Sequence, residues 1–207
     1  MKLNFFETVL VNNPVRGAML DYSVRWHYEA ACAPALGQVL EIGCGNGAGL
    51  LAIERRFRPA GLAGFDLDDQ QVARARSALA RLTERRSMSP VRLWTGDAEH
   101  LDAPSGSYDG VFEFAIFHHI PDWRRALSEV HRVLRPGGYF FFEELSREFF
   151  YDTGAFGALL RRTTEHPWDT MFDFPSFRQG LADAGLKLIA LGTHLVPGWH
   201  HGVAVRA

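Results

Sequence analysis

The chain has 207 residues, which suffices for one domain with a large core and is marginal for two. Hydrophobic residues make up 47% and charged residues 22%, the composition of an ordinary globular protein. The formal net charge of -2 excludes a strongly basic surface that would hold RNA or DNA.

The sequence gives three indications of cellular location. It contains no run of about 18 apolar residues, so no membrane span is expected. Its start, MKLNFFETVLVNN, has one lysine and a short apolar run broken by Glu7, and it is not typical of a signal peptide. Two cysteines, Cys32 and Cys44, are too few for a disulfide framework or a zinc site. We therefore expect a cytoplasmic protein.

Helix and strand patterns alternate along the chain from residue 15. Helical patterns cover 15–32, 47–57, 68–86, 121–134 and 177–185. Strand patterns cover 38–42, 61–67, 91–97, 108–114, 139–145, 186–194 and 201–207. Strands separated by helices favour right-handed crossovers and a parallel sheet covered on both faces. The expected fold is α/β, Rossmann-like and doubly wound: a mostly parallel seven-stranded sheet whose last strands form an antiparallel hairpin.

We expect one domain made of four consecutive parts. They are an N-terminal helical segment (1–37), a ligand-binding core (38–145), a covering segment (146–176), and a C-terminal helix with two strands (177–207). The covering segment is rich in aromatic residues and is expected to be irregular. Open parallel sheets bind ligands beyond the carboxyl ends of their strands, so this segment should lie over that edge.

The stretch VLEIGCGNGAG, residues 39–49, places four glycines within seven residues directly after a strand. Such a loop brings bare backbone and free N–H groups of a helix start to a ligand. Gly43, Gly45 and Ala48 also spell G-x-G-x-x-A, a form of the dinucleotide fingerprint. Asp66 follows at the distance expected of a ribose-binding acid. The loop alone therefore leaves a nicotinamide cofactor open.

Five segments in order carry a more specific resemblance. They are LEIGCGNG, GFDLD, TGDAEHL, YDGVFEFAIFHHIPD and HRVLRPGG, all between residues 38 and 145. In this order and spacing the chain resembles the class I S-adenosylmethionine-dependent methyltransferases, especially the small-molecule group. The resemblance implies S-adenosylmethionine as cofactor and S-adenosylhomocysteine as product. It further implies methyl transfer to an O, N or C atom of a small molecule. The aromatic residues of the covering segment indicate either a pocket for an apolar or aromatic substrate or a hydrophobic cap on the core.

The resemblance also implies which residues hold the cofactor. Glu41 is expected to order its amino-acid end, Asp66 its ribose hydroxyls, and Asp97 its adenine amino group. Leu67 should lie against adenine, and the Ala98 N–H should reach the ring. The alternatives are that Glu41 only braces the loop and that Asp66 only caps a helix. The complete expected set is Glu41, Gly43, Cys44, Gly45, Gly47, Asp66, Leu67, Asp97, Ala98, Glu113 and Phe114.

Two members of this set, Glu113 and Phe114, depart from the family pattern. Related enzymes place backbone and small side chains at this point, whereas this chain has one charged and one bulky residue. The departure suggests a link to the particular substrate and puts the role of both residues in doubt.

Methyl transfer from a sulfonium is an in-line displacement, so the enzyme mainly aligns the nucleophile and excludes water. A base is needed only when the nucleophile must lose a proton. The candidates for a catalytic role are His119, Glu143 and His166. The structural alternatives are that His119 only ties its loop, that Glu143 exits into solvent, and that His166 is part of a hydrophobic cap. No metal site is expected, because the GWHHG stretch at 198–202 has too few ligands.

Two other classes of function stay open. An NAD(P)-dependent oxidoreductase would need a Tyr–Lys pair or its equivalent, and Lys2 and Lys187 are the only lysines. A non-catalytic S-adenosylmethionine-binding protein is the second, because methyl transfer requires no diagnostic triad. RNA methylation is disfavoured by the missing basic surface, and no peptide groove is indicated. The expected partner is a small-molecule substrate, with no nucleic acid, bound by a monomer or homodimer.

Overall fold

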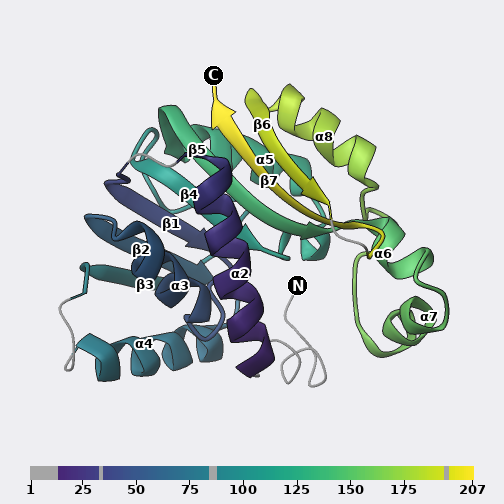
Figure 1. Ribbon diagram of the computed structural model, residues 1–207, viewed down its shortest axis with the longest axis horizontal. Helices are drawn as coiled ribbons and strands as arrows, with labels where there is room; N and C mark the ends of the chain where they lie inside the picture. The colour runs from purple at the N-terminus through teal and green to yellow at the C-terminus, as the bar shows by residue number, and fades with distance from the viewer. Residues whose placement is uncertain (1–13, 33–34, 84–87, 194–195) are drawn as a thin grey trace.

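A computed structural model describes residues 14–32, 35–83, 88–193 and 196–207. Within them seven strands form a sheet in the order β3-β2-β1-β4-β5-β7-β6 (Figure 1). They are β1 (Gln38–Ile42), β2 (Gly61–Asp66), β3 (Val91–Thr95), β4 (Tyr108–Phe114), β5 (Leu134–Leu145), β6 (Leu186–Thr193) and β7 (Trp199–Arg206). The first five strands are parallel, and β7 pairs antiparallel with both β5 and β6. The predicted α/β fold with its C-terminal hairpin is confirmed.

The helices of the described residues correct one sequence prediction. They are α2 (Pro14–Ala30), α3 (Ala48–Phe57), α4 (Asp69–Thr83), α5 (Trp123–Val133), α6 (Arg147–Tyr151), α7 (Gly154–Thr163) and α8 (Phe174–Asp183), with a 3-10 turn η1 (Phe117–His119). The segment 146–176 was expected to be irregular, but it contains α6 and α7. α6 has five residues, too few to show a helical period, whereas α7 has ten residues, as α3 and α8 do. The predicted ends at 84–86 and 194 lie outside the described residues. Among the described helices, none is long and apolar enough to cross a membrane.

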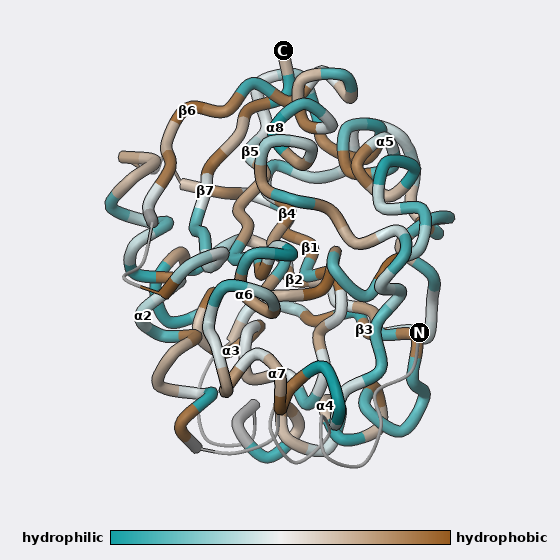
Figure 2. Tube along the Cα trace, turned by 90° about the vertical axis from the view of Figure 1, so that its right-hand side faces the viewer, coloured by the Kyte–Doolittle hydropathy of each residue, from teal (hydrophilic) through white to brown (hydrophobic). Residues whose placement is uncertain are grey.

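Alternating side chains give each face of the sheet its own core. Val39, Phe112 and Phe141 pack on one face with apolar residues of α2, α3 and α4. Leu40 and Val111 pack on the other face with α5 and α8. Figure 1 shows α2 and α3 in front of the sheet and α5 behind it, and Figure 2 shows hydrophobic stretches along the central strands. Burial on both faces explains why these strands are nearly continuous apolar runs.

The same alternation separates the two adjacent acids at the end of β5, Glu143 and Glu144. Glu143 faces α2, where its Oε1 accepts a hydrogen bond from Arg16 Nη1 at 2.8 Å and its Oε2 accepts one from Ser23 Oγ. Glu144 faces η1, where it contacts His118. Arg16 also donates to the Phe114 carbonyl at 3.0 Å. Residues of α2 are thus tied by charge to the ends of β4 and β5.

His27 of α2 lies beneath this network and is fully buried. Its Nε2 is 2.9 Å from the Phe142 carbonyl oxygen, and its ring packs on His201. Burial, and then His201, lowers the pKa of His27 to about 3. The unfolded chain, with an ordinary histidine pKa of about 6.5, therefore binds more protons than the folded one between these values. The free energy of unfolding should fall as the pH falls through this window.

The His27→Gln variant tests this pH dependence. From the pKa difference, we expect protonation of His27 in the unfolded chain to lower the wild-type free energy of unfolding by about 2 kcal/mol as the pH falls from 7 to 5. The variant should therefore lose about 2 kcal/mol less than the wild type over that range. Urea denaturation at both pH values measures it, with the exposed His100→Gln as control. Identical losses in the wild type and in His27→Gln would refute the assignment.

Candidate cofactor and acceptor site

The glycine loop joins β1 to α3 at the tips of the parallel strands. Gly43, Gly45 and Gly47 have φ angles of 67°, 50° and 86°, a region that favours glycine. A Cβ on Gly43 would lie 2.6 Å from Ile116 Cδ1, and one on Gly47 would lie 3.3 Å from Ala75 Cβ. A Cβ on Gly45 would meet no atom of the described residues within 4 Å. The loop therefore presents bare backbone toward open space at its middle glycine.

Cys44 lies inside this loop and is buried, with only 3% of its surface exposed. Its backbone N–H donates to the Phe65 carbonyl at 2.9 Å, which ties the loop to β2. Burial, together with Glu41 and Asp66, raises the pKa of the Cys44 thiol. The residue is accordingly a neutral packing group of the loop, and a cofactor contact through it stays a prediction.

Glu41, in β1, is buried beneath the loop with 3% of its surface exposed. Its Oε2 has no hydrogen-bond partner among the described residues. Burial raises the pKa of Glu41 well above its ordinary value, Arg16 opposes this effect, and Asp66 adds to it. A buried acid with one unpaired oxygen suits a cationic partner, because such a partner restores the ionised form. The α-ammonium of S-adenosylmethionine has the required charge.

Asp66 ends β2 beside the loop and uses both of its oxygens. Oδ2 accepts a hydrogen bond from the Gly45 N–H at 2.9 Å, and Oδ1 accepts one from the Asp68 N–H at 2.9 Å. Burial raises the pKa of Asp66, while these two backbone donors lower it. Each carboxylate oxygen can accept a further hydrogen bond, so bracing the loop and binding two ribose hydroxyls are compatible. Leu67, which follows, is 39% exposed.

The tips of β1, β2 and β3 follow one another along one edge of the sheet. In the strand register Ile42 pairs with Phe65, and Asp66 pairs with Thr95. Asp97 comes two residues after the end of β3; it is exposed, and its Oδ1 accepts from the Glu99 N–H at 2.9 Å. Ala98 beside it is buried. The expected acids therefore lie in sequence order along the edge where a parallel sheet binds its ligand.

Glu113 and Phe114, at the end of β4, point to opposite faces. Glu113 is completely buried, and its Oε2 accepts from the Ile116 N–H at 3.0 Å. Burial and the neighbouring Glu144 raise the pKa of Glu113 well above its ordinary value. Phe114 packs in the core against α2. Contact of either residue with the cofactor stays a prediction.

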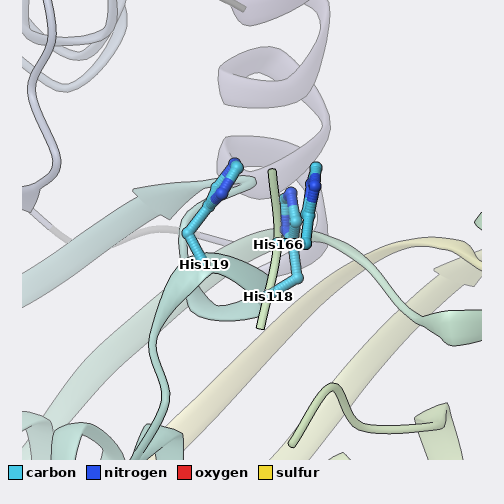
Figure 3. A group of neighbouring side chains, drawn as sticks. All are labelled: His118, His119 and His166. Atoms are coloured by element: carbon cyan, nitrogen blue, oxygen red, sulfur yellow. The ribbon is translucent and has the colours of Figure 1, made fainter. Parts of the chain in front are cut away.

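Three histidine rings lie together beyond the end of β4 (Figure 3). His118 and His119 belong to η1, and His166 comes from the covering segment. The ring centroids of His118 and His119 are 4.2 Å apart, and that of His166 is 5.2 Å and 4.4 Å from them. Burial, and then the other two rings, lowers the pKa of His119 well below its ordinary value. Burial, and then His118, lowers the pKa of His166 to about 3.

The sequence singled out His119 and His166 separately, and it missed both their proximity and the part taken by His118. The HH pair after an apolar strand was the available signal for His118, whereas His166 lies far along the chain.

Glu143, the third catalytic candidate, is in the α2 network on the opposite face from Glu144. Burial raises its pKa, but Arg16, His201 and Ser23 outweigh burial and hold it far below its ordinary value. The contacts therefore place Glu144, rather than Glu143, beside the histidines.

The covering segment brings an aromatic surface to these histidines. The Phe150 ring of α6 lies 5.8 Å from His118 and 5.4 Å from Trp168. Trp168 in turn lies 4.7 Å from His166. Tyr151, Phe156 and Leu159 are 45%, 55% and 58% exposed on α6 and α7. Aromatic rings therefore flank the histidines, and exposed apolar side chains lie elsewhere on α6 and α7.

The fold and the strand-tip residues together define a Rossmann-like cofactor-binding domain. Residues 40–142 match the family model described as "Methyltransferase domain". The chain is a member of the class I S-adenosylmethionine-dependent methyltransferases, as the sequence resemblance predicted.

Curated relatives and solved structures are consistent with this membership. The chain is 32% identical to a fatty-acid O-methyltransferase of Mycolicibacterium smegmatis, over 82% of this chain and 52% of that one. It is 38% identical to a phthiotriol/phenolphthiotriol dimycocerosates methyltransferase of Mycobacterium tuberculosis, over 52% of this chain and 37% of that one. The chain thus spans about half, or less, of these relatives. A SAM-dependent methyltransferase structure from Aquifex aeolicus shares the fold, with a TM-score of 0.75, 17% identity and full coverage of both chains.

The Gly49→Ala substitution tests the position of Glu41. A Cβ on Gly49 would overlap Glu41 Oε1 and lie 2.7 Å from Cδ, so alanine must displace this carboxyl. We expect the dissociation constant of S-adenosylhomocysteine to rise about tenfold, which corresponds to about 1.4 kcal/mol. Calorimetric titration measures it. Gly17→Ala in α2 is the matched control, because its Cβ would meet nothing within 4 Å. Equal affinities in the two variants would speak against a cofactor role for Glu41.

Proposed function

We propose that this protein is an enzyme that transfers the methyl group of S-adenosylmethionine to an oxygen atom of an apolar, lipid-like molecule. The observation that carries the cofactor part is the buried Glu41 oxygen without a described partner, under a glycine loop that Asp66 braces. These residues offer acids, but no cation, to a ligand that carries an ammonium, a sulfonium and a ribose.

Each residue of the strand tips binds a different part of the cofactor. Glu41 receives the ammonium, Asp66 receives the ribose hydroxyls, and Asp97 receives the adenine amino group. The backbone N–H of Ala98 and the side chain of Leu67 complete the adenine end. When bound, S-adenosylmethionine supplies an electrophilic methyl group on a sulfonium that leaves as a neutral sulfide. The protein is left with the tasks of aligning the acceptor and excluding water.

The aromatic residues of the covering segment support an apolar acceptor. Phe150 and Trp168 stand against the histidines, and Phe156 and Leu159 offer further apolar surface on α7. Ligand pockets for apolar molecules are lined in this way, with a few polar groups that fix orientation. Two relatives are named for fatty-acid O-methylation and for a phthiotriol lipid, which supports the same acceptor class.

Among oxygen acceptors we favour a carboxylate over a hydroxyl. A carboxylic acid has an ordinary pKa near 4, so it is already ionised at neutral pH and needs no base before it attacks the methyl group.

A methyl-transfer assay tests the proposal. The protein is incubated with S-adenosylmethionine carrying a labelled methyl group and with long-chain fatty acids, long-chain diols, short acids and small aromatic phenols. We expect label in the organic extract with the long-chain acceptors, and methyl esters by mass spectrometry with the fatty acids. Transfer only to short or aromatic acceptors would overturn the lipid assignment. Tight cofactor binding without transfer to any acceptor would favour a non-catalytic binding protein.

A further inference from the structure

The histidine group of His118, His119 and His166 has the composition of a metal site. One ring nitrogen from each residue lies within 4.8 Å of one from each of the other two. Figure 3 shows the three side chains next to one another, two from η1 and one from the covering segment. His118 is buried and the other two are partly buried. Two parts of the chain that are far apart in sequence thus converge on one point.

Glu144 supports this group in the way that outer carboxylates support metal-binding histidines. Its Oε1 contacts His118 Nδ1, and its Oε2 accepts from the Phe117 N–H at 2.7 Å. The Leu145 N–H also donates to Oε1 at 2.7 Å. A carboxylate that holds one ring nitrogen fixes the proton there and leaves the lone pair on the other nitrogen. For His118, that second nitrogen is Nε2.

We propose that His118, His119 and His166 together bind one divalent transition-metal ion of the zinc class. Neutral imidazoles suit Zn²⁺, Co²⁺ and Ni²⁺, and one ring nitrogen from each of the three histidines lies within 4.8 Å of one from each of the others. In a tetrahedral zinc site, with Zn–N distances of about 2.0–2.1 Å, ligand nitrogens lie about 3.4 Å apart. The ligand nitrogens, which now lie within 4.8 Å of one another, therefore approach by up to about 1.4 Å, and the rings turn toward a common point when the ion binds.

No metal site was expected from the sequence, because neither the two cysteines nor the GWHHG stretch offers enough ligands. His200 of that stretch stacks on Phe174 at 3.7 Å, and His201 Nε2 lies 2.8 Å from Ser23 Oγ. The three-histidine group instead joins η1 to a segment more than 40 residues away, a pairing that no local motif displays.

Three protein ligands leave the fourth coordination position open, as in zinc sites that bind a water molecule or a substrate oxygen there. The Phe150 and Trp168 rings flank the histidines. The open position is therefore suited to the carboxylate or hydroxyl oxygen of an apolar acceptor. This last step alone rests on the proposed function, whereas binding of the ion does not.

Metal binding is measured on the full chain without cofactor or acceptor. Metal-free protein is titrated with Zn²⁺ against a chromogenic chelator, and with Co²⁺ by its visible absorption. We expect one equivalent of tightly bound ion and a rise in the thermal unfolding temperature. His119→Asn, His166→Asn and Glu144→Gln should each weaken binding by about 10–100-fold. His100→Asn on the surface is the matched control and should bind as the wild type does.

A second measurement does not depend on any variant folding. Wild-type crystals soaked with Zn²⁺ should show an anomalous-scattering peak within about 2.1 Å of nitrogens from all three rings. A peak elsewhere, no peak, or zinc affinity equal in wild type and His119→Asn would overturn the proposal. Methyl transfer that survives metal removal would leave the proposed function intact and would sink only the acceptor-binding role of the ion.

Discussion

Replacing Arg16 with alanine is expected to lower the free energy of unfolding by about 3–5 kcal/mol, the cost of leaving a buried charge without its partner. Arg16 Nη1 lies 2.8 Å from Glu143 Oε1, and their side chains are only 15% and 1% exposed. The substitution also removes the hydrogen bond to the Phe114 carbonyl at the tip of β4. Urea denaturation at pH 7 measures the loss.

Two controls separate this effect from ordinary loss of surface charge. Arg55→Ala breaks an ion pair with Asp21 in which both side chains are more than half exposed, and it should cost less than about 1 kcal/mol. The Arg16→Met, Glu143→Gln double variant removes both charges and should recover much of the stability lost in Arg16→Ala. A loss in Arg16→Ala no larger than that in Arg55→Ala would show that the buried pair does not hold α2 to the sheet.

Replacing Asp66 with alanine is expected to weaken binding of S-adenosylhomocysteine by about 3 kcal/mol, roughly 150-fold in Kd. The variant removes the acceptor proposed for the ribose hydroxyls. It also releases the Gly45 N–H, which Asp66 Oδ2 holds at 2.9 Å, so the loop loses its brace. Calorimetric titration of wild type and variant measures the change.

Two further variants distinguish the sources of that loss. Asp66→Asn keeps one amide oxygen but removes the charge, so its affinity should fall between those of wild type and Asp66→Ala. Asp102→Ala removes an acid that is 83% exposed and pairs with Arg92, so its affinity should not change. Unchanged affinity in Asp66→Ala would show that the ribose does not bind at the tip of β2.

The sheet was predictable because its evidence is local. Apolar runs such as 38–42 and 108–114 are buried on both faces, and the helices between them require parallel crossovers. The glycine loop was predictable for the same reason, since positive φ angles at Gly43, Gly45 and Gly47 leave a direct trace in the sequence. The five-residue helix α6 leaves no such trace; α7 has the same length as α3 and α8 but was missed within a segment that was expected to be irregular.

The pairing of polar side chains was not predictable, because it depends on contacts between distant parts of the chain. Alternation placed Glu143 and Glu144 on opposite faces, but it did not say what each would meet. Glu143 meets Arg16, 127 positions away, and Glu144 meets His118. His166 reaches η1 only because the covering segment folds back over it. Such partners are set by tertiary packing rather than by any local pattern.

A crystal structure with S-adenosylhomocysteine would show which residues hold the cofactor. We expect the ligand's ammonium within hydrogen-bond distance of Glu41, its ribose hydroxyls in contact with Asp66, and its adenine beside Asp97 and Ala98. Its sulfur should then face the histidine group under the covering segment. A ligand bound away from the tips of β1, β2 and β3, or one that leaves Glu41 and Asp66 without contact, would contradict these assignments.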